Sequence, residues 1–192
     1  MNLYDYAVSG AVCDAVISNT ERNGIKQDQL PSFLADDGYL DEECGRPALY
    51  NNPAETVYAI WIGTNDLGYG GFLTEVQPEG MPLTYFTDCV YETLDRLHQA
   101  GGRVFVLMNI APLDLSPEYG LPGQGGLKSP DYWEEKTSYD KNITRPSEKM
   151  RQYLTMVNAV FDYQTPYDLL LGGRYPGSSF ALYDVHALVR SL

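Results

Sequence analysis

The stretch that most constrains the fold runs from Val57 to Gly68 and reads VYAIWIGTNDLG. Its first half is apolar, aromatic and β-branched, which predicts a short buried strand. Its second half is rich in residues that favour turns: Gly63, Asn65, Asp66 and Gly68. A strand that stops abruptly in small polar residues places those groups at the carboxyl edge of a sheet, where open α/β sheets bind ligands. The rest of the chain is expected to build a sheet and a pocket around this edge.

Further strands and helices are predicted to alternate along the chain. Strands are expected at residues 3–8, 103–110 and 180–183, and helices at residues 86–97 and from Ser147 to about Gly172, with a kink or interruption at Pro166. A short helical or extended piece is expected at residues 30–34. The order strand, helix, Gly101-Gly102, strand is a βαβ crossover, so strands 57–62 and 103–110 should be parallel neighbours. This alternation predicts an α/β fold, and a length of 192 residues fits a single domain, residues 1–192.

Two long polar or irregular stretches interrupt this pattern. Residues 35–56 are acidic and are interpreted as a surface connection. Residues 111–147 are rich in Pro and Gly and carry Tyr119, Tyr132, Trp133 and Tyr139. A run of this length without regular structure is unusual in a compact domain and is often functional. It is either a lid or binding loop, or an inert surface insertion.

The charge and the cysteines narrow the classes of function. The net charge of −13 disfavours nucleic acid as a partner, because phosphate backbones would be repelled. No stretch is apolar and long enough to predict a membrane span. The three cysteines, Cys13, Cys44 and Cys89, form no C-x-x-C motif and have no His at ligand spacing, so no metal site is expected. They allow either one disulfide and a free thiol or three buried thiols.

Two residues at strand ends suit the stabilisation of a negative charge. Gly10 follows the predicted strand 3–8, and its backbone N–H is accessible because glycine lacks a Cβ. Asn65 follows strand 57–62 and offers a side-chain amide N–H. Donors of this kind form the oxyanion hole of acyl-transfer enzymes. Each residue alone is also compatible with a purely structural role in a turn.

Several segments resemble the conserved blocks of the SGNH/GDSL hydrolases, in the correct order. Residues 5–11 resemble the block that supplies the oxyanion-hole Gly, and residues 63–66 resemble the block that supplies the oxyanion-hole Asn. Further similarity lies at residues 108–113, 157–158 and 175–184, and extends nearly end to end toward the fungal acetylesterases of carbohydrate esterase family sixteen. The resemblance implies a three-layer α/β/α sandwich with a flavodoxin-like parallel sheet. It assigns the oxyanion hole to Gly10 and Asn65.

The chain departs from the family pattern at both ends and therefore looks truncated. The Gly-Asp-Ser block, which carries the nucleophile on the first strand, has no counterpart, and neither has the C-terminal Asp-x-x-His block. Asp184-Val185-His186 is one residue too short, and we interpret it as a structural segment at the end of the last strand, with a catalytic His186 as the alternative. His98 is expected on the surface. Ser9, Ser116 and Ser129 lack the strand-to-helix elbow of a nucleophile, so neither nucleophile nor general base is found.

The resemblance implies a carboxylic ester hydrolase that removes acetyl groups from carbohydrate by a Ser-His-Asp mechanism whose nucleophile is not in this chain. The first alternative is an inactive truncated form or pseudoenzyme that binds carbohydrate. The second is a small-ligand or nucleotide binder, which has only fold-level support. No cofactor is expected. The family implies secretion, which the sequon Asn142-Ile143-Thr144 mildly favours, although residues 1–6 do not resemble a signal peptide.

The absent first strand also predicts a structural weakness. In the family this strand lies between the strand before Gly10 and the strand before Asn65. Its removal leaves two edges with unpaired backbone groups and a gap in the core. The 192 residues alone are therefore expected to be weakly stable, to pair these two strands with each other, or to aggregate.

Overall fold

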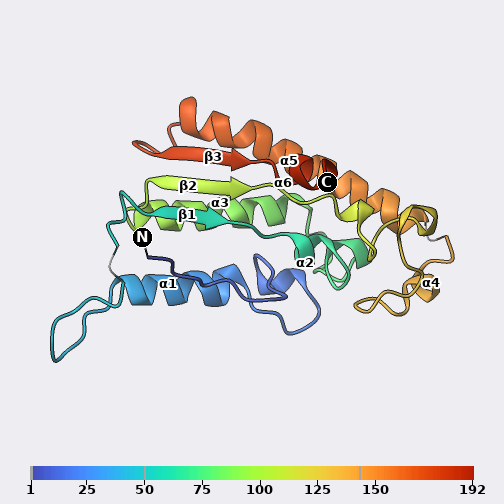
Figure 1. Ribbon diagram of the computed structural model, residues 1–192, viewed down its shortest axis with the longest axis horizontal. Helices are drawn as coiled ribbons and strands as arrows, with labels where there is room; N and C mark the ends of the chain where they lie inside the picture. The colour runs from blue at the N-terminus through green and yellow to red at the C-terminus, as the bar shows by residue number, and fades with distance from the viewer. Residues whose placement is uncertain (1, 50, 143) are drawn as a thin grey trace.

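The computed structural model describes residues 2–49, 51–142 and 144–192 (Figure 1). Two residues used in the sequence analysis lie outside the described residues. They are Met1, the first residue of the segment 1–6 that does not resemble a signal peptide, and Ile143, the middle residue of the glycosylation sequon. The sheet has three parallel strands in the order β1-β2-β3, where β1 is Val57–Ile60, β2 is Val104–Met108 and β3 is Ser179–Tyr183. Val57 pairs with Val104, and Val104 pairs in turn with Ser179. The predicted parallel pairing of the two central apolar runs is confirmed.

Two long helices cross over between these strands. α3 (Thr84–Gln99) joins β1 to β2, and α5 (Thr144–Leu170) joins β2 to β3. Because both right-handed crossovers step in the same direction along the sheet, the two helices lie on the same face and touch each other. The Phe161 ring of α5 lies 6.4 Å from Phe86 and 6.2 Å from Tyr91 of α3. The core is therefore built between these helices and one face of the sheet.

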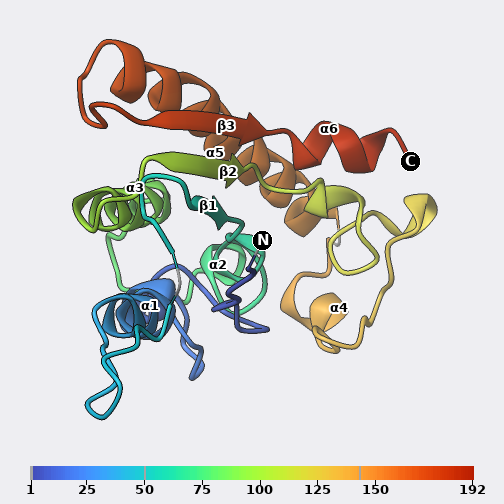
Figure 2. The ribbon, with the colours of Figure 1, turned by 60° about the vertical axis from the view of Figure 1, so that its left-hand side comes forward.

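The two faces of the sheet differ sharply in exposure. Tyr58 and Ile60 of β1 and Phe105 and Leu107 of β2 point toward the helices and are buried. The intervening side chains of each strand point to the other face, where Val57 is 56% exposed to solvent. The α/β architecture with a parallel sheet is thus confirmed (Figure 2). The described residues cover one face of that sheet with long helices and leave the second face open.

Shorter helices complete the chain. α1 (Leu30–Asp37) lies below the edge strand β1 in Figure 1. Three further helices are short: α2 (Thr64–Leu67) follows β1, α4 (Lys136–Tyr139) lies between β2 and α5, and α6 (Val185–Arg190) follows β3. Short 3-10 turns occupy Ala15–Ile17, Phe72–Thr74, Leu113–Leu115 and Pro122–Gln124, and a π-turn occupies Ile25–Gln29. Within the described residues, every helix is too short or too polar to cross a membrane.

A disulfide settles the open question about the cysteines. Cys13 is bonded to Cys89, and both side chains are buried, whereas Cys44 is an exposed free thiol. Cys13 lies just before the 3-10 turn at Ala15–Ile17, and Cys89 lies in α3. The bond therefore attaches the N-terminal segment to the main helical layer.

Three predicted elements differ from the structure. Residues 3–8 form no strand, because the sheet of the described residues consists of β1, β2 and β3, and a strand requires pairing in such a ladder. α5 is not interrupted at Pro166 and begins three residues before the predicted start at Ser147. The turn at residues 63–68 continues as the single helical turn of α2.

Candidate active site

The turn after β1 is set by Gly63. This residue adopts φ 125°, a conformation that favours glycine, and a Cβ on it would lie 2.4 Å from Cδ1 of Ile110. The chain can therefore turn from the segment after β1 into α2 only with glycine at this position. As a result Asn65 lies in the first turn of α2, directly beyond the carboxyl end of β1.

The two predicted oxyanion-hole residues lie on one small cavity. Gly10 and Asn65 line a volume of about 140 Å³ together with residues 61–64 and residues 8 and 11. Gly10 is exposed and has φ 79°, and its N–H donates no hydrogen bond to any described residue. The Nδ2 of Asn65 donates one hydrogen bond, 3.0 Å long, to the carbonyl oxygen of Ala11. Because an amide group carries two N–H donors, one remains available at this cavity.

Arg22 forms hydrogen bonds with both Gly10 and Asn65, a role that no pattern in the sequence indicates. Its Nη1 donates to the carbonyl oxygen of Gly10 and to Oδ1 of Asn65, each at 3.0 Å. A guanidinium group only donates hydrogen bonds, so the amide oxygen of Asn65 must face Arg22. The amide nitrogen is thereby turned the other way, as an oxyanion donor requires. The arginine also places a positive charge beside the cavity.

Asp66 holds this turn through a buried contact with the N-terminal segment. Its carboxylate is fully buried and accepts a 2.7 Å hydrogen bond from the backbone N–H of Cys13. Burial raises the pKa of Asp66 to about 7, and the hydrogen bond from Cys13 only partly offsets that effect. Its second oxygen has no hydrogen-bond partner among the described residues. Asp66 thus connects α2 to the N-terminal segment and does not line the cavity.

Asp184 and His186 lie elsewhere on the sheet edge and have separate partners. Asp184 caps α6 by accepting a hydrogen bond from the backbone N–H of Ala187, and it accepts another from Nδ2 of Asn109. These two bonds lower the pKa of Asp184. The Nδ1 of His186 lies 3.3 Å from the carbonyl oxygen of Ile110, and no hydrogen bond joins its ring to Asp184 among the described residues.

Asp184 and His186 come directly after β3, where Asp184 is the N-cap of α6 and His186 lies in its first turn. Residues 184 and 186 begin a helix, so their side chains do not point to the same side of a strand. Both also follow β3, whereas Asn65 follows β1, with β2 between them. The geometry is that of a helix cap, and a catalytic role of His186 remains an untested alternative.

The remaining His and Ser candidates lie outside the cavity. His98 is in the last turn of α3, at the amino end of β2, and its ring lies against Tyr175 at 5.7 Å. The hydroxyl groups of Ser116 and Ser129 donate to the carbonyl oxygens of Leu113 and Glu134. Ser9 is exposed beside Gly10. In the described part of the chain none of these hydroxyls is hydrogen-bonded to a histidine.

The Pro- and Gly-rich loop is a packed structure beside α2. Trp133 is fully buried and stacks on Tyr69, with ring centroids 5.4 Å apart. Lys136 is also fully buried, and its ammonium group donates to the carbonyl oxygens of Glu118, Gly120 and Leu127. Burial lowers the pKa of Lys136. The stack on Tyr69 holds the loop against the segment that follows α2. Whether it acts as a lid stays a prediction.

The side chains at the cavity offer hydrogen-bond donors and no set of metal ligands. No group of three or more His, Cys, Asp and Glu side chains is arranged to hold a metal ion in the described ranges. Two N–H donors and a nearby cation at the end of a strand suit an oxygen that gains negative charge.

Comparisons with known proteins identify the family of the chain. Residues 2–182 match the family described as GDSL-like Lipase/Acylhydrolase. The chain is 40% identical over 199 residues to an acetylesterase from Hypocrea jecorina. The aligned region covers 99% of the chain and 54% of that enzyme, so the chain spans about half the length of the curated relative it matches. On these matches, the chain belongs to the GDSL-like lipase/acylhydrolase family.

Proposed function

We propose that this chain forms part of a carboxylic ester hydrolase that removes acetyl groups from carbohydrate. The observation that carries the proposal is the placement of Gly10 and Asn65 on one cavity at the carboxyl end of β1. The similarity to an acetylesterase favours the acetyl group as the acyl part of the substrate. In this proposal a serine nucleophile and its general base come from polypeptide outside these 192 residues.

The proposed chemistry follows from the donors at the cavity. Attack on an acetyl ester turns the carbonyl oxygen into an oxyanion. The N–H of Gly10 and the free N–H of Asn65 would donate to that oxygen, and Arg22 would hold both groups in place. One such donor is typically worth about 10²–10³ in rate, because it is oriented before the charge forms. Asp66 would support the turn without touching the substrate.

We also propose that the protein is secreted. The disulfide between Cys13 and Cys89 supports an oxidising compartment, because such bonds are rare in the cytosol. The substrate partner would be a small-molecule or oligosaccharide acetyl ester. The net charge of −13 is unfavourable for binding nucleic acid.

The oxyanion hole can be tested without a nucleophile. We expect methylphosphonate, an anion with tetrahedral oxygens, to shift the ¹H–¹⁵N signals of the Gly10 N–H and the Asn65 side chain. Neutral dimethyl sulfone should shift them far less. Asn65→Ala should abolish the saturable shift at Gly10, whereas Asn51→Ala, away from this cavity, should not. Equal shifts with both probes, or an unaffected Asn65→Ala variant, would argue against the proposed site.

Activity provides a second arm of the test. The 192-residue chain should hydrolyse 4-nitrophenyl acetate no faster than buffer. In a longer form of the protein that carries the nucleophile, Asn65→Ala should lower kcat by about 10²–10³ and change KM little. Hydrolysis by the 192-residue chain that disappears in Asn65→Ala would show that the nucleophile lies within it.

The alternative of a non-catalytic carbohydrate-binding protein rests on Trp61. This side chain is 57% exposed and lines the same cavity, so it could stack on a sugar ring. Calorimetry with acetylated and deacetylated xylo-oligosaccharides separates the two. Binding of both sugars together with a failed methylphosphonate titration would favour the binding protein.

A further inference from the structure

Another polar cavity lies at the carboxyl ends of β2 and β3. It has a volume of about 430 Å³ and is bounded by α5, α6 and the turn Leu113–Leu115. Asn109, which follows β2, and Asp184, which follows β3, both line it. We call it the α6 cavity. The described residues that line it are all different from those around Gly10 and Asn65, so the proposed function does not use it.

One residue of the α6 cavity, Asp114, carries a buried carboxylate without a partner. Asp114 lies in the turn Leu113–Leu115 and is only 9% exposed. Among the described residues its Oδ1 has no hydrogen-bond partner, and no ion pair joins it to Arg151 or Arg190 of the same cavity. A buried acceptor of this kind is costly unless it receives a donor. Because Asp114 lines the cavity, a bound molecule with a hydroxyl group can supply that donor.

Further acceptors of the α6 cavity are held in fixed orientations. Asn109 donates from Nδ2 to Oδ1 of Asp184 at 2.8 Å, and its Oδ1 accepts from the backbone N–H of His186 at 2.9 Å. The Nδ1 of His186 lies 3.3 Å from the carbonyl oxygen of Ile110, which can only accept, so in the neutral ring Nδ1 carries the proton. Nε2 of His186 is therefore an acceptor. Neither Nε2 nor Oδ2 of Asp184 receives a hydrogen bond from a described residue.

Charges of both signs surround the α6 cavity. Burial and the nearby negative charge of Asp184 raise the pKa of Asp162, so these carboxylates lie close enough to repel each other. Together with Asp114 they oppose a bound anion, whereas Arg151 and Arg190 oppose a bound cation. In the described part of the chain, no group of His, Cys, Asp and Glu is arranged to hold a metal ion. This combination favours a neutral ligand with several donors and acceptors.

Two exposed aromatic rings extend the α6 cavity along α5. Tyr163 lines this cavity and also an adjoining one, where Tyr167 lies about one helical turn further on. Both tyrosine side chains are exposed, and the adjoining cavity is lined only by uncharged residues. A Tyr ring combines an apolar face with a polar tip, which suits the apolar face of a sugar ring and its hydroxyl groups.

We propose that the α6 cavity and the adjoining face of Tyr163 and Tyr167 bind a neutral oligosaccharide. One sugar unit would donate hydroxyl hydrogens to Asp114 and Asp184 and accept from an arginine, and the next unit would stack on Tyr163. Such a ligand fits better than an apolar molecule, because it satisfies the buried carboxylate. The proposal does not depend on the hydrolysis of an acetyl ester, since binding here needs neither Gly10 nor a nucleophile.

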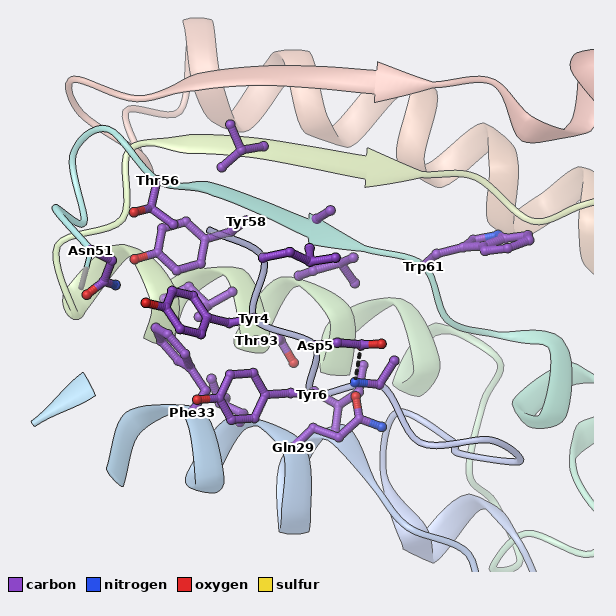
Figure 3. Close-up of a pocket in the computed structure, with 18 of the residues that line it drawn as sticks. Tyr4, Asp5, Tyr6, Gln29, Phe33, Asn51, Thr56, Tyr58, Trp61 and Thr93 are labelled. Atoms are coloured by element: carbon purple, nitrogen blue, oxygen red, sulfur yellow. Dashed lines mark hydrogen bonds between the residues drawn. The ribbon is translucent and has the colours of Figure 1, made fainter. Parts of the chain in front are cut away.

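The competing location for a sugar is the cavity between β1 and residues 2–7, which Figure 3 shows. Its volume is about 280 Å³, and Tyr6, Tyr58 and Trp61 are among its aromatic residues. Asp5 is the one charged residue in its described lining, and Oδ1 of Asp5 already accepts a hydrogen bond from the backbone N–H of residue 7. This cavity therefore offers fewer free acceptors to sugar hydroxyl groups, and the test must separate the two locations.

The test is a titration of the oxidised, ¹⁵N-labelled 192-residue chain with three trisaccharides of the same glucan backbone. Cellotriose is neutral, its glucosamine counterpart is cationic and its glucuronic acid counterpart is anionic. The ¹H–¹⁵N signals locate the bound sugar on the protein. Saturation transfer from the protein reports which protons of the sugar rings lie against an aromatic side chain.

We expect cellotriose to give saturable shifts at the backbone signals of Asp114, Tyr163 and His186, and none at Trp61 or Gly10. The two charged trisaccharides should bind at least fivefold more weakly, because each meets charges of its own sign in the α6 cavity.

An exchange of tyrosines tests the stacking contact. Tyr163→Ala should weaken the binding of cellotriose about fivefold and reduce the saturation transfer. Tyr132→Ala removes another exposed ring, in the Pro- and Gly-rich loop, and should change neither.

Asp114→Asn separates a role in binding from a role in folding. It should weaken binding about tenfold, since a charged acceptor forms stronger hydrogen bonds than an amide. It should not lower the free energy of unfolding, because the carboxylate has no hydrogen bond to a described residue to lose. Asp131→Asn, at an exposed position, should leave both quantities unchanged. The emission of the buried Trp133 checks the fold of each variant.

Several results would overturn the proposal. Tighter binding of either charged trisaccharide would indicate a site for an ion. Shifts centred on Trp61 would place the sugar in the cavity of Figure 3. The α6 cavity is also excluded by the absence of saturable shifts up to about 20 mM, or by loss of stability together with binding in Asp114→Asn. The methylphosphonate titration at Gly10 is a separate measurement, so the two proposals can fail independently.

Discussion

At the scale of single residues, the most unusual group is the carboxyl of Asp66. It is fully buried, one of its oxygens has no partner among the described residues, and burial raises its pKa to about 7. An unfolded Asp has a pKa near 3.9. Between these two values the folded protein binds a proton that the unfolded chain has released. Because the folded state then holds more protons, the free energy of unfolding must fall as the pH rises through this window.

The first prediction follows from this difference in pKa. The contribution of Asp66 to stability should be complete below about pH 4 and lost as the pH rises through 7. The loss is on the order of 4 kcal/mol for about three pKa units. Asp66→Asn, which keeps an acceptor for Cys13, should flatten the curve of unfolding free energy between pH 5 and pH 8. Urea unfolding at several pH values measures this.

Asp88→Asn is the matched control for that experiment. Asp88 lies on the exposed side of α3, so its replacement should leave the pH dependence unchanged. A curve for Asp66→Asn as steep as that of the unmodified chain would assign the pH dependence to other groups.

The site illustrates what local sequence can predict about individual residues. Gly10 and Asn65 could be proposed because each follows a strand-like run and precedes a turn. Arg22 could not, because its contact with Asn65 joins residues 43 positions apart and depends on how two turns meet. No spacing or composition near Arg22 marks it as different from a surface arginine.

At the scale of elements, the local apolar pattern predicts some helices and strands, whereas tertiary contacts decide others. β1, β2 and α3 were predicted because their apolar patterns lie within one segment. Residues 3–8 have a strand-like sequence and still form no strand, since the pairing partner decides the outcome. Pro166 lies inside α5. The hydroxyl group of Thr165, the residue before it, is hydrogen-bonded to the hydroxyl group of Tyr91 in α3, with the oxygens 2.9 Å apart. This tertiary packing overrides the local preference of proline to end the helix.

The loop around α4 supports a second prediction at this scale. The ammonium group of Lys136 donates hydrogen bonds to three carbonyl oxygens of the loop, those of Glu118, Gly120 and Leu127. Lys136→Met keeps the apolar volume and leaves these oxygens buried without a donor, which typically costs about 2–4 kcal/mol. We expect faster hydrogen exchange across residues 118–136 and a red shift of Trp133 emission. Urea unfolding should show reduced stability.

Lys128→Met provides the comparison, because Lys128 is an exposed lysine of the same loop. It should change neither exchange nor emission. If both lysine variants behave alike, the loop is held by the stack of Trp133 on Tyr69 and not by the buried ammonium group.

At the scale of the whole molecule, the two faces of the sheet differ in how far they are covered. One face of the sheet packs on α3 and α5, and the disulfide between Cys13 and Cys89 fastens the N-terminal segment to that layer. The other face exposes Val57 and Trp61 of the β1 segment and Tyr183 of β3. These exposed side chains place apolar surface on the uncovered face of the sheet.

The last prediction concerns the stability of the 192 residues as a unit. A sheet of three strands with one covered face buries less apolar area than a sheet covered on both faces, so less free energy opposes the chain entropy. We expect a thermal midpoint below about 45 °C, strong binding of the dye ANS in native buffer, and association that increases with concentration. Reduction of the disulfide, which closes a sequence separation of 76 residues, should lower the midpoint further by removing about 4 kcal/mol. A cooperative melt with a high midpoint and no ANS binding would show instead that the single helical layer is sufficient.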